Sequence, residues 1–505
     1  MVQVNTFTGD LMPGPKTQEL TAASGSLKRF IPAGNRFQFP RKQSAAAPGF
    51  NLFSVRWHLS PPVDIDGFVA AYYAGYQDPL NGLQPIGNDL RIACSLMYPT
   101  ANSPGAGKSF SKDGIYQVPV KNGSVVYTDR LSMALPANTP YRVRTWVSPG
   151  RAIDGVSVAG SATAFTTITP LTFADIGQTI WIPGAGAAGA AFSATISSIS
   201  SSNAGVLSAA ASTTVTQVTG LIGGGYVPYG IPCLGSGNGG SLSGFGGSAT
   251  DQSAYSSALA ESSQGSGNPG NNAANDTSFE PMIYACTARQ IRSWALFGDS
   301  ITYGAIEVGS GGNTTLSGAG DAYGNAGIWP RAIAAKGAIY HNFGISGSIL
   351  NTWATDGYSN FMLDLGANVC NAAIVALGTN DELSYTSAQI LANIQKMVNK
   401  LTSLGFQKIV VPTLMPRTTS SNGFADVANQ TVDPNRSPVV TAVNAGLLGG
   451  QITGATIMDI GSLFADPTVP TKWRADGGVW TPDGTHPSMY AMIQTNAAMT
   501  AMLPS

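Results

Sequence analysis

Charged side chains are scarce in this 505-residue sequence, where they make up 10% of the residues against about 25% in an ordinary soluble protein. The few charges balance, because 26 basic residues face 27 acidic ones and leave a net charge of −1. A chain without a basic surplus lacks the electrostatic footprint that nucleic acid and anionic lipid require. We therefore expect no nucleic-acid partner and no membrane partner. The lack of charge also excludes a coiled coil or a charged disordered tail.

Cysteine is rare as well. The four cysteines, Cys94, Cys233, Cys286 and Cys370, are scattered along the chain and form no C-x-x-C pair. A structural zinc site needs clustered thiolates or imidazoles, so the sequence predicts no metal site. A disulfide between Cys233 and Cys286 and a set of buried thiols both remain open.

Long apolar runs are missing too, since none approaches the roughly 20 residues that a membrane-spanning helix needs. The segment Met1–Asp10 has neither the basic nor the apolar part of a signal peptide, and we expect none here. A chain rich in glycine, serine and threonine, poor in charge and lacking such a signal fits a phage structural protein, because virions leave the cell by lysis, and it fits a truncated chain as well. The expected location is therefore extracellular or virion-associated.

What the sequence does contain is abundant backbone punctuation, with 61 glycines and 31 prolines. Such residues favour short strands joined by turns. In residues 1–165, the segments Asn51–Trp57 and Tyr141–Val147 alternate apolar and polar side chains as half-buried strands do. Between them, Asp113-Gly114 and Asn122-Gly123 are turn sequences. We predict an all-β, sandwich-like domain with a role in attachment or scaffolding.

Residues 166–220 change character. Phe173–Gly189 is rich in glycine and alanine, and Ala194–Ile199 and Gly205–Val215 follow it as short strand candidates. This stretch resembles a small β module of phage tail and tailspike proteins, which implies other virion proteins as partners and a homotrimer. A generic Gly/Ala-rich β insert remains an equal alternative. Residues 221–289 are rich in glycine, serine and asparagine, which predicts a linker or an extended arm.

From residue 290 to residue 505, strand and helix patterns alternate. Short apolar runs predict five buried strands of a parallel sheet: Ser293–Phe297, Ala338–Asn342, Ala372–Leu377, Lys408–Val411 and Ala455–Asp459. Apolar residues at helical spacing run from Ile390 to Leu404, and Gly405 provides a stop. A last helix is predicted to begin at Pro487. The pattern predicts a flavodoxin-like α/β domain, whose chemistry gathers at the carboxyl ends of the strands.

Reactive side chains follow these strand ends. The first strand runs into Gly298-Asp-Ser-Ile-Thr302, where glycine permits a sharp turn and Ser300 begins the next helix. Near the C-terminus, Asp483 and His486 lie three residues apart, a spacing at which a carboxylate can hold one tautomer of the imidazole. These residues form a candidate nucleophile, orienting acid and general base. The tripeptide alone also fits a serine that only caps a helix.

The sequence also holds one rival acid and two further histidines. Asp476 is a rival acid, but its separation from His486 defines no geometry. His58 lies in the β region and His341 ends a predicted buried strand. We interpret both of these histidines as structural.

Four blocks in this order carry a family resemblance: Gly298-Asp-Ser-Ile-Thr302, Asn342-Phe-Gly-Ile-Ser-Gly-Ser348, Leu377-Gly-Thr-Asn-Asp381 and Thr481-Pro-Asp-Gly-Thr-His-Pro487. Residues 290–505 resemble the GDSL or SGNH hydrolases. The resemblance implies a carboxylic ester hydrolase without metal or organic cofactor, with Ser300 as nucleophile, His486 as base and Asp483 as its orienting acid. It also implies an oxyanion hole made by the amides of Ser300 and Gly347 and the side chain of Asn380. We choose Gly347 over Gly344, which we expect to relieve backbone crowding.

The resemblance leaves the ester open, and the residues lean toward sugar. Trp353, Trp473 and Trp480 lie in predicted loops near the site, where flat rings can stack on pyranoses, with packing inside the domain as the alternative. The sequence shows no long apolar flap like a lipase lid. We therefore expect a carbohydrate O-acetylesterase that acts on an acetylated polysaccharide. The alternatives are a structural or adhesive virion protein that binds glycan, and a lipase or thioesterase of the same family.

Overall fold

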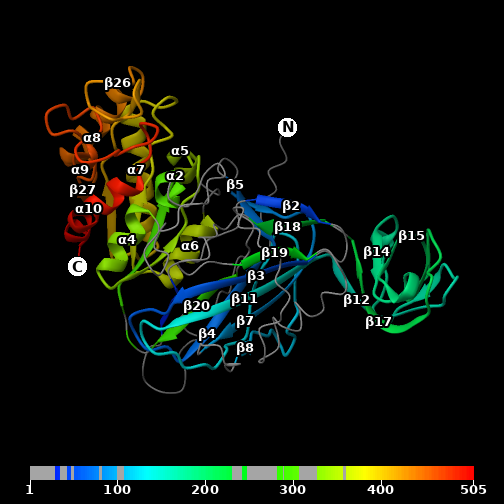
Figure 1. Cartoon of the computed structure of the whole chain (residues 1–505). Helices are drawn as coiled ribbons and strands as arrows, with labels where there is room; N and C mark the ends of the chain where they lie inside the picture. The colour runs from blue at the N-terminus through cyan, green and yellow to red at the C-terminus, as the bar shows by residue number, and fades with distance from the viewer. Residues whose placement is uncertain are drawn as a thin grey trace.

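The computed structural model describes residues 29–34, 42–46, 51–78, 82–98, 107–223, 225–229, 242–246, 281–287, 289, 291–305, 327–355 and 360–504. Figure 1 shows three parts: an α/β domain, a strand-rich region beside it, and a small barrel on the side of that region away from the α/β domain. Our predictions for the first ten residues and for Cys233 lie outside the described residues. Cys94, Cys286 and Cys370 are buried thiols. Among the described helices, none combines the length and the apolar character needed to cross a bilayer.

The N-terminal region is built from strands, as predicted. One sheet has the order β1-β20-β4-β10, and the other β19-β3-β11-β7-β8, with β9 also paired to β7. Their bounds are β1 Arg29–Pro32, β3 Asn51–Leu59, β4 Gly67–Tyr73, β7 Leu90–Met97, β8 Gly107–Ser109, β9 Val118–Val120, β10 Val125–Tyr127, β11 Pro140–Pro149, β19 Leu242–Gly246 and β20 Met282–Thr287. The two segments predicted from alternation are β3 and β11, which pair antiparallel. A short two-stranded sheet is formed by β5 (Gly75–Asp78) and β6 (Gly82–Pro85).

For residues 221–289 a linker or an extended arm was predicted, and the residues described there form paired strands rather than a linker. Within residues 221–289, three stretches are strands: β18 (Gly225–Tyr229) pairs with β2 (Lys42–Ala46), β19 pairs with β3, and β20 lies between β1 and β4. Every residue of β20 is buried. The short apolar run Met282–Thr287 was hidden by the glycine- and serine-rich residues that precede it, so average composition pointed to a linker.

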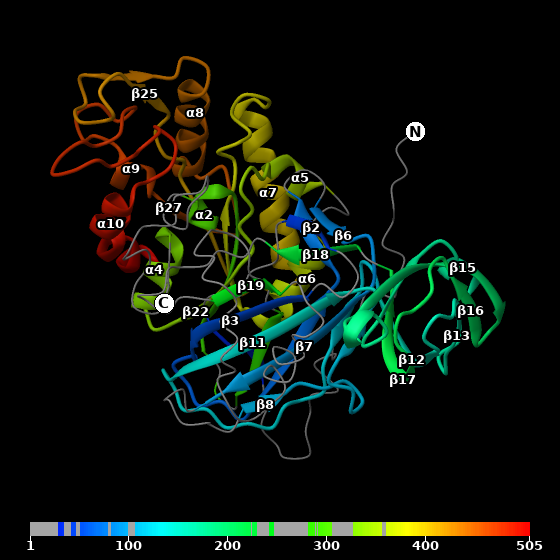
Figure 2. The ribbon, with the colours of Figure 1, turned by 45° about the vertical axis from the view of Figure 1, so that its right-hand side comes forward.

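The Gly/Ala-rich module is a closed barrel with the strand order β12-β13-β16-β15-β14-β17. The strands are β12 Arg151–Val158, β13 Ala164–Thr166, β14 Thr179–Ile182, β15 Phe192–Ser201, β16 Ala204–Leu207 and β17 Val215–Ile222. Figure 2 shows it again at the side of the strand-rich region, away from the α/β domain. The predicted boundary at residue 166 is too late, because β12 pairs with both β13 and β17 and is needed to close the ring.

The C-terminal sheet is parallel and has the order β22-β21-β23-β24-β27. Its strands are β21 Ser293–Gly298, β22 Ile339–Asn342, β23 Ala372–Ala376, β24 Lys408–Pro412 and β27 Thr456–Met458, close to the five predicted runs. In chain order this is 2-1-3-4-5, the doubly wound arrangement predicted from the alternating pattern. Alternate residues of β21 enter opposite cores, with Phe297 in one and Leu296 in the other.

Helices cover both faces of this sheet. They are α2 Ser300–Tyr303, α4 Ile328–Ala335, α5 Leu350–Ala354, α6 Asn360–Val369, α7 Ser387–Ser403, α8 Ser437–Leu448, α9 Gly461–Phe464 and α10 Met489–Met502. The predicted helix at residues 390–404 is α7, which begins with a capping box between Thr386 and Gln389. The last helix begins two residues later than predicted. Ser488 caps α10 by accepting a hydrogen bond from the Ala491 amide at 3.1 Å, so Pro487 lies before the helix.

The strand-rich region and the α/β domain share one hydrophobic core. Tyr73 of β4 stacks on Phe361 of α6 with ring centroids 6.1 Å apart, and Tyr284 of β20 lies 6.4 Å from His341 of β22. Burial lowers the pKa of His341 to about 3, so its imidazole is neutral. His58 is also buried and stacks on Tyr141. Both histidines have the structural role expected of them.

Candidate active site

The nucleophile candidate lies where β21 ends and α2 begins. A Cβ on Gly298 would collide with the Thr302 side chain, so only glycine permits the tight turn. Asp299 caps α2 by accepting a hydrogen bond from the Ile301 amide at 2.9 Å. Ser300 follows as the first helical residue, with 6% of its surface exposed. This turn therefore presents the Ser300 hydroxyl at the carboxyl end of the central strand.

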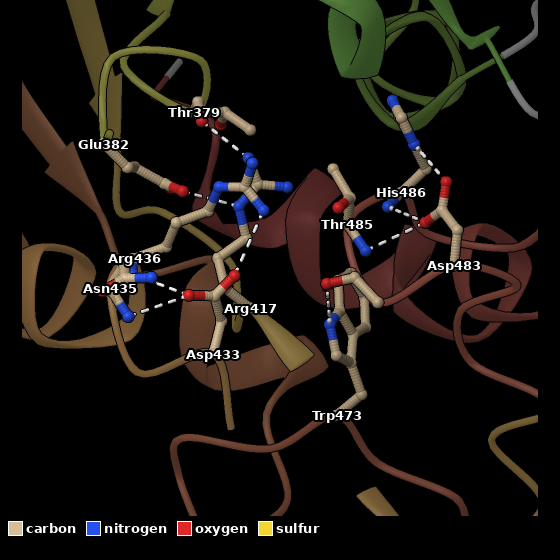
Figure 3. A network of polar contacts seen from close by, with 11 residues as sticks. Thr379, Glu382, Arg417, Asp433, Asn435, Arg436, Trp473, Asp483, Thr485 and His486 are labelled. Carbon is tan, nitrogen blue, oxygen red and sulfur yellow. Dashed lines mark hydrogen bonds and ion pairs between the residues drawn. The ribbon is translucent and has the colours of Figure 1, made fainter. Parts of the chain in front are cut away.

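The acid and the base lie on a single turn near the C-terminus. Asp483 Oδ2 is 2.7 Å from His486 Nδ1, and His486 Nε2 is 2.7 Å from Ser300 Oγ. Asp483 Oδ1 also accepts hydrogen bonds from the amides of Thr485 and His486, at 2.9 and 2.8 Å. Figure 3 shows the Asp483 carboxylate between these groups. The fold thus brings Ser300 to His486 across 186 positions of the chain.

The charge state of Asp483 fixes the direction of these hydrogen bonds. Burial acts to raise the pKa of Asp483, but hydrogen bonds from the His486 ring and amide hold it at about 2. An ionised carboxylate only accepts hydrogen bonds, so His486 Nδ1 carries the proton and donates it. In the neutral imidazole, Nε2 then carries no hydrogen and can accept the Ser300 hydroxyl proton. The rival acid Asp476 is instead paired with Arg474.

The loop after β22 carries Gly347, whose amide the resemblance implies as an oxyanion donor beside that of Ser300. Among the described residues, neither the Gly347 amide nor the Ser300 amide has a hydrogen-bond partner. Gly347 is exposed and has a φ of +83°, which favours glycine. The Gly344 amide, in contrast, donates to Asn342 Oδ1 at 2.8 Å. A Cβ on Gly344 would also lie 2.7 Å from the Tyr303 nitrogen, the crowding expected of it.

A family model for GDSL-like lipases and acylhydrolases matches residues 296–490. This segment is a GDSL-like lipase/acylhydrolase domain. The chain is accordingly a carboxylic ester hydrolase.

Several solved structures are similar to this esterase domain. Est24, a carbohydrate acetylesterase from Sinorhizobium meliloti, is 17% identical over 42% of this chain and 97% of its own, with a TM-score of 0.28. The M. smegmatis aryl esterase is 16% identical over 42% and 97%, with a TM-score of 0.30. A member of the lipolytic protein G-D-S-L family from Veillonella parvula DSM 2008 is 17% identical over 42% and 98%, with a TM-score of 0.28. No curated protein sequence matches the chain.

The three tryptophans do not line the esterase site. Trp353 and Trp473 are fully buried and Trp480 is 3% exposed. Trp353 packs on Phe297, and the indole N–H of Trp473 donates to the Gly484 carbonyl at 3.0 Å. Their rings have no face available to a sugar, so the predicted stacking role is wrong. A large apolar ring is buried by the hydrophobic effect wherever other elements of the domain cover it, even if its position in the sequence suggests a loop.

A buried polar network beside the triad was missed in the sequence. Arg417 Nε donates to Glu382 Oε2 at 2.6 Å and its Nη2 donates to the Thr379 carbonyl at 2.6 Å (Figure 3). Burial raises the pKa of Glu382 to about 7, against the opposing charge of Arg417. Glu382 directly follows the third block in the chain, but Arg417 comes 35 positions later and no spacing connects the two.

Asp299 is expected to destabilise the folded esterase domain at neutral pH. Burial raises its pKa from 3.8 to about 6, and its Oδ2 has no partner among the described residues. As the pH falls, the folded state takes up this proton at a higher pH than the unfolded state does. The loss of folding stability caused by the buried charge is therefore present above pH 6 and disappears as the pH falls toward 4. The raised pKa lowers the free energy of unfolding by about 3 kcal/mol at neutral pH.

Asp299→Asn keeps the cap of α2 and removes the charge. We expect its melting temperature to exceed that of the wild type at pH 7.5 and to converge with it at pH 4.5, as measured by calorimetry at both pH values. Equal melting temperatures at pH 7.5 would contradict this cost of burial.

Asn380 is expected to act on the transition state. Its Nδ2 donates to the Ser348 carbonyl at 2.9 Å, so its amide group lies beside the loop that carries Gly347, and the resemblance implies that it is an oxyanion donor. Losing one oxyanion donor typically lowers kcat by about 10²–10³-fold. We expect Asn380→Ala to lower kcat on p-nitrophenyl acetate by this factor with little change in KM. Asn371, an asparagine beside the opposite end of β23, supplies the control Asn371→Ala, and a loss confined to KM would contradict the assignment.

Proposed function

We propose that the esterase domain works through an acyl-serine intermediate formed on Ser300. His486 Nε2 removes the hydroxyl proton while Oγ attacks the carbonyl carbon, and a tetrahedral oxyanion forms. Asp483 stabilises the imidazolium that results. The imidazolium then protonates the leaving alcohol, and a water deprotonated by the same imidazole hydrolyses the acyl-serine. Every proton transfer in this cycle passes through one nitrogen, His486 Nε2.

One observation carries this mechanism: two successive contacts of 2.7 Å connect Asp483 to His486 and His486 to Ser300. Both distances are those of hydrogen bonds, and the second is short enough for the Ser300 hydroxyl proton to pass to His486 Nε2. Ser300 is almost fully buried while Asp483 is 43% exposed, so the hydroxyl lies at the base of the site and the acid at its edge. A serine that only capped a helix would need neither partner.

The oxyanion would be held by three donors from three loops. These are the Ser300 amide, the Gly347 amide and the second N–H of Asn380 Nδ2, whose first N–H is bound to Ser348. Donors that are already in place cost no reorganisation when charge develops, and each is typically worth about 3–4 kcal/mol of barrier height.

We further propose that the substrate is an O-acetylated polysaccharide. The support is architectural, because the esterase domain shares its core with a strand-rich region, and a six-stranded barrel is inserted into that region between β11 and β19. Neither part is needed for ester hydrolysis, and both add surface along which a polymer can be held. We also propose a virion or extracellular location, which the charge-poor composition supports. The barrel's resemblance to a phage tail module supports this location and a homotrimer.

The substrate proposal is tested by acetate release from acetylated xylan, together with p-nitrophenyl esters of increasing acyl length, using Ser300→Ala as the blank. We expect acetate release that depends on Ser300 and a rate that falls as the acyl chain grows. Faster hydrolysis of acyl chains of about eight carbons or more would favour the lipase or thioesterase alternative. Glycan binding without any hydrolysis would favour the adhesive alternative.

A further inference from the structure

Asp381 is a buried carboxylate for which the mechanism above has no use. It is fully buried and directly follows Asn380. Both of its oxygens accept hydrogen bonds from backbone amides of another loop. Its Oδ2 accepts from the Leu350 amide at 2.8 Å, and its Oδ1 accepts from the Asn351 amide at 3.1 Å. Burial raises the pKa of Asp381, while these two amides act to lower it. A buried charge is costly, so its retention at this place needs a reason.

The loop it grips is the one that carries the Gly347 amide. Asn380 Nδ2 holds the Ser348 carbonyl, and Asp381 holds residues 350 and 351, so two consecutive residues fix the chain directly after Gly347 at three points. On the other side of Gly347, Asn342 accepts from the Gly344 amide and donates to the Thr302 carbonyl of α2 at 2.9 Å. Hydrogen bonds therefore fix the chain on both sides of Gly347. On the C-terminal side, Asp381 accepts two of the three.

Asp381 is itself held rigidly. Its amide donates to the Gly378 carbonyl at 3.1 Å, and its carbonyl accepts from the amides of Ser384 and Tyr385, both at 2.9 Å. The turn after β23 thus fixes Asn380 and the Asp381 carboxylate together. A displacement of this turn would move two of the three oxyanion donors relative to Ser300.

We propose that Asp381 is a positioning residue, whose carboxylate clamps residues 350–351 so that the Gly347 amide points at the oxyanion. This inference rests on the proposed acyl-serine mechanism. It differs from a purely structural cap of α5, because a cap affects folding alone, whereas a clamp on an oxyanion donor affects the transition state more than the ground state.

The test compares Asp381→Asn and Asp381→Ala with the wild type. Asparagine keeps the shape of the side chain and one acceptor oxygen, but its NH₂ group then faces one of the two backbone amides of residues 350 and 351. Alanine removes both acceptors. We expect kcat on p-nitrophenyl acetate to fall about tenfold for asparagine and about 100-fold for alanine, with KM within about twofold of the wild type. Affinity for phenylboronic acid, whose serine adduct is tetrahedral, should fall in proportion to kcat/KM.

The matched control is Asp466, whose Oδ1 accepts from the consecutive amides of Thr468 and Val469, both at 2.9 Å. Asp466→Asn and Asp466→Ala should leave kcat and boronic acid affinity unchanged. The proposal is overturned if the Asp381 variants keep the wild-type kcat, if their loss is confined to KM, or if boronic acid affinity stays constant while kcat falls. If Ser300→Ala and Asn380→Ala instead keep the wild-type kcat, the underlying mechanism is overturned. The two failures are therefore distinguishable.

Discussion

Ser300→Ala is expected to lower kcat for ester hydrolysis by about 10⁴–10⁶-fold, the loss seen when a serine hydrolase loses its nucleophile. The reason is that no other described hydroxyl lies within hydrogen-bond distance of His486 Nε2. The variant removes one oxygen from a residue at the start of a capped helix whose cap, Asp299, stays in place. We therefore expect a melting temperature close to that of the wild type.

The control for this variant lies on the same strand. Ser293 begins β21, is buried, and donates a hydrogen bond to the Val369 carbonyl at 3.1 Å, at the end of the strand opposite Ser300. Ser293→Ala removes the same atom type from the same element and should retain kcat. Purified Ser300→Ala that hydrolyses p-nitrophenyl acetate at the wild-type rate would remove Ser300 from the mechanism.

Asp483→Asn is expected to lower kcat by about 10⁴-fold, because an amide can hold the imidazole in the wrong tautomer. In the wild type, the carboxylate of Asp483 accepts the Nδ1 proton at 2.7 Å, and its low pKa of about 2 keeps it ionised throughout the neutral range. Asparagine can donate to Nδ1 instead and leave the proton on Nε2, where it blocks proton uptake from Ser300. The pH–rate profile of the wild type should show no step that belongs to Asp483 above pH 4.

Asp476→Asn separates the two candidate acids. Asp476 forms an ion pair with Arg474 on the surface and makes no hydrogen bond to His486 in the described structure. This variant should keep kcat within about twofold of the wild type, since exposed ion pairs contribute little. A loss for Asp476→Asn equal to that for Asp483→Asn would contradict the assignment of the orienting acid.

The sequence predicted the parts of the fold that depend on local pattern. Five short apolar runs became the five strands of the parallel sheet, and the apolar spacing from Ile390 to Leu404 became α7. The triad was predictable because Asp483 and His486 are close in sequence and a glycine turn precedes Ser300. Each of these signals lies within a few residues of the chain.

What the sequence did not show depends on contacts between distant segments. The run Met282–Thr287 is a buried strand because β1 and β4 flank it, and no local pattern announces those neighbours. Trp353, Trp473 and Trp480 looked exposed in predicted loops, but packing from other elements buries them. The Arg417–Glu382 ion pair and the grip of Asp381 on residues 350–351 likewise join segments about 30 to 35 positions apart.

The central claim is that His486 activates Ser300 as the nucleophile, and covalent trapping tests it most directly. A p-nitrophenyl phosphonate ester should label the wild type once, and peptide mass spectrometry should place the adduct on Ser300. Labelling should be lost in Ser300→Ala and strongly slowed in His486→Ala. An adduct on any other residue, or an active enzyme that the phosphonate does not label, would contradict the account.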